Sequence, residues 1–156
     1  MQLATADFEH MDDAQRLAVL EAMVVGLIAD NQVTPPEVRR FDEIVMALPW
    51  GVERPVLAAM ISGARNRLAA LKTRDEIDAY VKQLAERLPS QELREKVVFT
   101  MATLMFSDGE QVQAEKNVLG LFVIAFGITS ERATAIRDAL HVGVTPVASN
   151  LDRTEN

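Results

Sequence analysis

The chain has 156 residues, of which 49% are hydrophobic, so it can bury one core within one domain. It has no cysteine, which excludes a disulfide framework, thiolate metal ligands and cysteine catalysis. Its formal net charge of −7 argues against nucleic acid as the main partner, because a phosphate backbone attracts basic surfaces. We also expect no transmembrane segment, since the longest apolar run, 118–128, is shorter than the about 20 residues that span a bilayer.

The spacing of apolar residues predicts an all-α chain of about seven helices joined by short turns. Residues 1–11 are polar and unpatterned, and we expect a mobile N-terminal segment there. A helix over 13–29 is apolar nearly all round, as is typical of the middle of a bundle, and Gly26 favours close approach of a neighbour. The next helix starts at Thr34, which forms a capping box with Glu37.

The rest of the helical pattern has equally clear boundaries. Five further helices are expected, over 55–71, 74–88, 91–107, 112–126 and 130–140. Thr73 and Glu76 form a second capping box, which starts the helix over 74–88. Gly127 ends the helix over 112–126. The helical domain therefore covers 12–142, and 143–156 form a polar C-terminal tail.

Two stretches of the chain repeat each other. Residues 91–126 align with 13–48 when they are moved back by 78 positions, without a gap. Each stretch has an apolar helix that ends in an aspartate, a short turn, a glutamate seven residues after the aspartate, and a second apolar helix. We therefore predict an internal duplication, with two helical hairpins packed about a pseudo-two-fold axis and their long helices crossing near the centre.

The turns of the two hairpins are acidic. A carboxylate at the C-terminal end of a helix is electrostatically unfavourable, because the helix dipole is negative there, yet both hairpins place one there. Hard cations such as Ca²⁺ and Mg²⁺ prefer carboxylate oxygens. The candidate metal ligands are Asp30, Glu37, Asp108, Glu110 and Glu115. The alternative is turn chemistry alone, in which the aspartates accept backbone hydrogen bonds and Glu37 serves only its capping box.

No catalytic or cofactor-binding residue stands out. The serines lack the context of a hydrolase nucleophile, the glycines form no phosphate-binding loop, and neither histidine has a partner at ligand spacing. Asp30 and Asp108 would suit acid–base catalysis only if the fold brought them into one pocket. Trp50, beside a proline and a glycine at a helix end, is expected to be a packing residue. The apolar helix over 118–126 is either buried or a surface for a second copy, a partner helix or a membrane.

At the acidic turns the sequence resembles the TerB-like family, the all-helical domain of bacterial tellurite-resistance proteins. The resemblance rests on an alanine-aspartate-glycine-like helix end followed by an acidic helix start, at 29–37 and again at 107–115. It covers about 13–140. Asn31 and Ser107 depart from the glycine and alanine that the family often has there, and the Pro35-Pro36 pair is not typical of it.

The resemblance implies a compact seven-helix domain with no enzymatic activity. It implies acidic turns that bind a divalent cation, Ca²⁺ or Mg²⁺, through the five carboxylates named above. It also implies a cytoplasmic protein of stress or tellurite-resistance complexes near the inner membrane, with peripheral membrane association. The expected partner is another protein or a second copy, and not nucleic acid.

Overall fold

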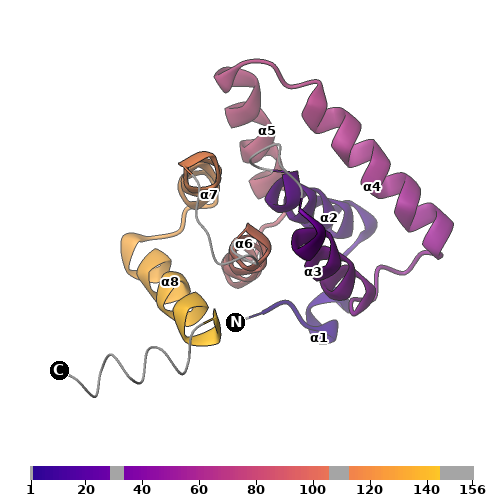
Figure 1. The fold of residues 1–156 in the computed structure, drawn as a ribbon, viewed down its shortest axis with the longest axis horizontal. Helices are drawn as coiled ribbons and strands as arrows, with labels where there is room; N and C mark the ends of the chain where they lie inside the picture. The colour runs from indigo at the N-terminus through magenta and orange to yellow at the C-terminus, as the bar shows by residue number, and fades with distance from the viewer. Residues whose placement is uncertain (1, 29–33, 106–112, 145–156) are drawn as a thin grey trace.

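The structure is a computed structural model that describes residues 2–28, 34–105 and 113–144, without the side chains of 113–115 and 141–144. The described part is all-helical, which confirms the predicted fold class (Figure 1). Its eight helices are α1 (Thr5–Phe8), α2 (Asp13–Ile28), α3 (Pro35–Met46), α4 (Arg54–Ala69), α5 (Arg74–Glu86), α6 (Gln91–Met105), α7 (Gln113–Ala125) and α8 (Ser130–Val144). Seven of them are the predicted helices, and α1 is additional.

Helices α2 and α6 form the centre of the bundle and pack against each other more extensively than any other described pair (Figure 1). Gly26 permits this approach, because a Cβ there would lie only 3.2 Å from the carbonyl oxygen of Met101. Helix α3 covers both central helices, α4 flanks α2, and α7 and α8 flank α6. The predicted packing of the two long helices is therefore confirmed, whereas the duplication and its pseudo-two-fold axis stay predictions.

The two central helices are buried where their sequences are apolar nearly all round. Every residue from Ala18 to Leu27 is buried, as is every residue from Val97 to Ala102. Burial of this kind is the main favourable term in folding, at roughly 25 cal/mol per Å² of apolar surface. Buried residues of the other helices join the same cluster, so the described part of the chain has one core.

Local chemistry sets the helix starts. Both predicted capping boxes are present, at Thr34 with Glu37 and at Thr73 with Glu76. Ser90 accepts a hydrogen bond from the backbone N–H of Leu93 at 3.2 Å, so it caps α6. None of the described helices is long and apolar enough to cross a bilayer.

The segment 1–11 contains α1 and contributes to the core. Phe8 is 1% exposed and packs edge-on against Trp50, with ring centroids 5.0 Å apart. Asp7 forms a salt bridge with Lys96 of α6 at 2.8 Å. The segment is thus attached to the domain through specific contacts, while its mobility stays a prediction. Most of the predicted tail, 145–156, lies outside the described residues.

Candidate functional site

The predicted cation site is only partly within the described structure. Asp30, Asp108 and Glu110 lie outside the described residues. Glu115 is the third residue of α7, where only the backbone is described. Glu37 is therefore the one candidate ligand whose side chain lies within the described part of the chain, and the relation between the two acidic turns stays a prediction.

Glu37 lies in the first turn of α3 and is buried, at 2% exposure. Its Oε1 accepts hydrogen bonds from the backbone N–H of Thr34 at 3.1 Å and from the Thr34 hydroxyl at 2.7 Å. Its Oε2 is buried and has no hydrogen-bond partner in the described part of the chain. The capping box thus uses one carboxylate oxygen and leaves the other as an available acceptor.

The start of α3 favours the negative charge of Glu37, but few other potential metal ligands lie near it in the described part of the chain. The helix dipole is positive at the start of α3, which favours a carboxylate there. Within the described ranges no cluster of three or more histidine and acidic side chains is arranged to hold a metal ion. Any site built on Glu37 would therefore take its further oxygen ligands from the neighbouring turn, where Asp30 lies in the sequence.

A second buried carboxylate, Glu21 of α2, was not identified from the sequence. It is 2% exposed, and its Oε1 accepts from Arg67 Nε at 3.0 Å and from the Tyr80 hydroxyl at 2.9 Å. Its Oε2 accepts from Arg87 at 3.0 Å. A single glutamate inside an otherwise apolar stretch was the available signal, but its partners lie in α4, in α5 and at the C-cap of α5, far along the chain.

The Glu21 cluster is a structural connection rather than a binding site. Both carboxylate oxygens already have donors, so the group is fully satisfied. Burial, and next the charge of Glu21, raise the pKa of the Tyr80 phenol, which therefore remains a proton donor to the carboxylate. The cluster joins α2 to α4 and α5 through polar contacts where the rest of the core is apolar.

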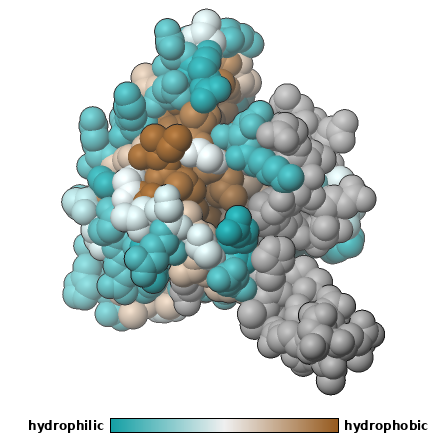
Figure 2. Space-filling view, turned by 90° about the vertical axis from the view of Figure 1, so that its left-hand side faces the viewer, coloured by the Kyte–Doolittle hydropathy of each residue, from teal (hydrophilic) through white to brown (hydrophobic). Residues whose placement is uncertain are grey.

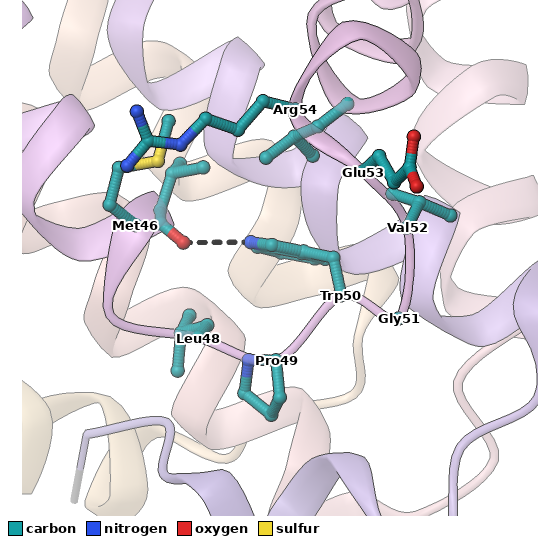
Figure 3. A pocket seen from close by; sticks show the side chains of 10 residues that line it. Met46, Leu48, Pro49, Trp50, Gly51, Val52, Glu53 and Arg54 are labelled. Carbon is teal, nitrogen blue, oxygen red and sulfur yellow. Dashed lines mark hydrogen bonds between the residues drawn. The ribbon is translucent and has the colours of Figure 1, made fainter.

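A hollow of about 470 Å³ opens at the turn between α3 and α4 (Figure 3). Trp50 forms part of its wall, and its indole Nε1 donates to the carbonyl oxygen of Val45 at 2.8 Å. Trp50 is only 5% exposed, which confirms its predicted role as a packing residue. Gly51, with φ of 78°, turns the chain at a backbone conformation that other residues rarely adopt.

Helix α7 has one buried face and one face exposed to solvent. Phe122 and Phe126 lie fully in the core, whereas Ile124 is 80% exposed. Hollows of about 240 Å³ flank the helix on both sides, one toward α5 and one toward α8. Figure 2 looks onto the side of the molecule where α7 and α8 lie, and it shows apolar side chains gathered among hydrophilic ones. Both alternatives for this helix, burial and an interaction surface, thus have support in different residues.

The chain matches a known protein family. Residues 16–138 match a family model described as tellurite resistance protein TerB. The matched range begins in α2 and ends in α8, so it includes both acidic turns and leaves out α1. No curated protein and no solved structure matches the chain.

Proposed function

Because the chain belongs to the TerB family, we propose that it is a non-enzymatic binding module that holds a divalent cation at its acidic inter-helix turns. We assign it to stress or tellurite-resistance complexes of the cytoplasm, as family membership suggests. The proposed ligands are Asp30 and Glu37 at one turn, and Asp108, Glu110 and Glu115 at the other.

The observation that carries this proposal is the free oxygen of Glu37. A buried polar atom without a partner costs about 1–3 kcal/mol, and more if it is charged, so natural structures rarely retain one without a reason. Glu37 Oε2 is such an atom among the described residues, and the sequence pattern predicts the same side chain as a ligand. A cation bound to this oxygen would remove the cost.

The chemistry of the proposed ligands selects the cation. They are all carboxylates, which favour Ca²⁺ or Mg²⁺ over softer metals. The chain has no cysteine and only two histidines, at His10 and His141, both far in sequence from the turns. Zn²⁺ would lack the nitrogen and sulfur ligands that it prefers.

Calorimetric titration with Ca²⁺, Mg²⁺, Mn²⁺ and Zn²⁺ tests the proposal. Glu37→Gln keeps the capping geometry, since glutamine also serves at this position, but it removes the charge. Glu76→Gln makes the same change in the exposed capping box of α5 and is the matched control. We expect binding heat for Ca²⁺ or Mg²⁺ that Glu37→Gln reduces and Glu76→Gln retains. Equal heats for wild type and Glu37→Gln would remove Glu37 from the site.

A second candidate function is an interaction scaffold that uses the outer face of α7. The 80% exposure of Ile124, in the middle of an apolar helix, favours it. Analytical ultracentrifugation of Ile124→Glu against Val38→Glu, an exposed apolar position on α3, separates a specific surface from general stickiness. A dimer that only Ile124→Glu dissociates would support the scaffold, and a wild-type monomer at high concentration would exclude self-association through α7.

A further inference from the structure

Helix α7 presents one exposed face to solvent. Lys116, Gly120 and Ile124 are spaced four residues apart, so they lie along one side of the helix, and all three are exposed. Ile124 is 80% exposed, the highest value among the five large hydrophobic side chains that are exposed in the described part of the chain. Figure 1 shows α7 at the outside of the bundle. The face therefore has a glycine at its centre and longer side chains on both sides of it.

Gly120 has no packing reason inside the described part of the domain. A glycine in the middle of a helix is less favourable than an alanine. At Gly26 an added Cβ would lie 3.2 Å from the carbonyl oxygen of Met101, and at Gly63 it would lie 3.4 Å from the Arg67 guanidinium. At Gly120 an added Cβ would meet no described atom within 4 Å. A close neighbour that explains this glycine would have to come from outside the chain.

An apolar hollow of about 240 Å³ lies beside this face, between α7 and α8. Gly120 belongs to its lining, which is apolar apart from Lys116 and Arg137. In the sequence an acidic residue stands next to each of these cations, Glu115 beside Lys116 and Asp138 beside Arg137. The positive and negative charges are therefore balanced here, and a partner would be selected by shape and apolar contact rather than by charge.

We propose that α7 joins two copies of this chain into a symmetric dimer, in which the two α7 helices cross antiparallel at Gly120. The inference rests on the second candidate function, the interaction scaffold, and names a second copy as its partner. At a two-fold crossing, a residue four positions after the centre lies opposite the residue four positions before it. Ile124 of one copy therefore meets the aliphatic stem of Lys116 of the other copy, and this contact is made twice.

The charges of the face favour the antiparallel arrangement. In an antiparallel crossing the two Lys116 side chains lie on opposite sides of Gly120, roughly 12 Å apart along the helices at 1.5 Å per residue. A parallel crossing would place the two ammonium groups side by side, where they repel each other. The missing side chain of Gly120 lets the two backbones approach at the centre.

The equivalent face of α3 lacks this complementarity. Val38, Asp42 and Met46 hold the places of Lys116, Gly120 and Ile124 in the predicted repeat. Asp42 is exposed, so two α3 helices that crossed there would bring two carboxylates together. The difference at this one position explains why α7, and not α3, would carry the contact.

Introduced cysteines test the arrangement directly, because the chain has none of its own. Gly120→Cys has space for its side chain, and at the crossing the two thiols come within reach of a disulfide, which needs Cα atoms about 4.4–6.8 Å apart. Oxidation with diamide should convert Gly120→Cys into a covalent dimer on a non-reducing gel. Met46→Cys, at an exposed position of α3, is the control and should stay monomeric.

A mixed experiment reports the direction of the helices. Lys116→Cys and Ile124→Cys should each give little dimer alone, because equal positions lie apart in the antiparallel crossing. An equimolar mixture of the two variants should give a covalent dimer that contains one copy of each. A covalent dimer of Ile124→Cys with itself, or equal yields for Gly120→Cys and the Met46→Cys control, would overturn the proposed arrangement.

Gly120→Leu separates dimer formation from folding. At a concentration where the wild type is monomeric, Gly120→Leu should raise the urea midpoint, because leucine favours the helix and its Cβ has free space. The same side chain fills the gap at the crossing, so it should weaken the dimer about tenfold. Ala59→Leu adds an apolar side chain at an exposed position of α4 and should leave the dimer unchanged. An unweakened Gly120→Leu dimer would contradict the proposal.

Sedimentation equilibrium measures the strength of the dimer. One helix crossing offers less than the roughly 800 Å² per partner of stable complexes, so we expect a dissociation constant on the order of 100 μM. Each copy carries a formal net charge of −7, so added salt should strengthen this apolar contact by screening the repulsion. A dimer that weakens with salt, or a chain that stays monomeric at about 1 mM, would overturn the proposal.

The outcomes separate this inference from both proposed functions. A wild-type dimer without the Gly120→Cys disulfide would keep the scaffold function and exclude this crossing. Calorimetric titration of Gly120→Leu with Ca²⁺ and Mg²⁺ should match that of wild type, because Gly120 is not among the proposed ligands. Failure of the dimer therefore leaves the cation proposal intact.

Discussion

The hairpins α2–α3 and α6–α7 have similar inner halves and different outer halves. In both, the long helix is buried over most of its length and packs against the other long helix. The outer helix α3 carries four charged residues in its exposed middle, whereas α7 carries none after Lys116. The comparison teaches that packing requirements restrict the inner helices most strongly, and that the outer helices are where the two hairpins are free to serve different roles.

Each hairpin is closed by one arginine at the start of its long helix. Arg16 and Arg94 hold equivalent places in the predicted repeat, and each donates hydrogen bonds to backbone carbonyls before its own helix and after the outer helix. The acceptors are Phe8 and Trp50 for Arg16, and Ala85, Leu88 and Phe126 for Arg94. Both hairpins also end near a glycine with positive φ, at Gly51 and Gly127.

The largest expected difference between the hairpins is in how firmly the outer helix is anchored. Phe122 of α7 is completely buried, so Phe122→Ala should destabilise the protein by about 3–5 kcal/mol. Ile44 is the equivalent residue of α3 and is only partly buried, so Ile44→Ala should cost about 1–2 kcal/mol. Urea unfolding followed by circular dichroism measures both. Equal losses would mean that α3 and α7 are anchored alike.

The second difference lies at one equivalent pair of core positions. Glu21 of α2 corresponds to Phe99 of α6, and both are buried. Glu21→Gln should lower the free energy of unfolding by about 2 kcal/mol, because it removes the charge that Arg67 and Arg87 face. The loss is limited because Arg67 is half exposed and therefore partly solvated. Denaturant unfolding tests this, with Glu43→Gln on the exposed face of α3 as the control. A loss no larger than that of the control would show that the charge of Glu21 contributes little to stability.

The two closing arginines should differ by a smaller amount. Arg94→Lys should cost about 1–2 kcal/mol and Arg16→Lys about 1 kcal/mol, because lysine cannot serve several carbonyls at once and Arg94 serves more of them. Thermal unfolding of the two variants side by side measures the difference. A larger loss of stability for Arg16→Lys would mean that Arg16 stabilises its hairpin more than Arg94 does.

The smallest effect concerns α1, which precedes the first hairpin in the chain and pairs with α6 of the second. Burial raises the pKa of Asp7, but hydrogen bonds from Lys96 and the Ala4 backbone outweigh it and hold that pKa below its usual value. A depressed carboxyl pKa stabilises the fold above the unfolded-state value of about 3.9, and this stability is lost as the pH falls through the folded-state value.

Asp7→Asn should therefore cost about 0.5 kcal/mol at pH 7, and the difference from wild type should shrink below about pH 4. Urea midpoints measured between pH 3 and pH 7 test this, with Asp42→Asn of α3 as an exposed control. A difference that stays constant over this range would mean that the charge of Asp7 does not matter.

Sequence patterns predicted what is local and missed what is assembled from distant residues. The capping boxes at Thr34 and Thr73 were recognisable because all their atoms lie within one turn of helix. The Glu21 cluster was not, because its donors lie between 46 and 66 residues further along the chain. Helix α1 has four residues, too few for a periodic pattern, and contacts of Phe8 and Asp7 with later segments hold it. The hollow at the α3–α4 turn likewise has no sequence signature.

The salt bridge between Asp7 and Lys96 has a consequence for biosynthesis. The two residues are 89 positions apart, so α1 leaves the ribosome well before α6 and waits for its partner while most of the domain is translated. At synthesis rates of about 5–20 residues per second, this delay lasts on the order of 5–20 seconds. During that interval Phe8 has no completed core to enter. The apolar side chain of Phe8 therefore stays exposed on the nascent chain until later segments of the domain have been made.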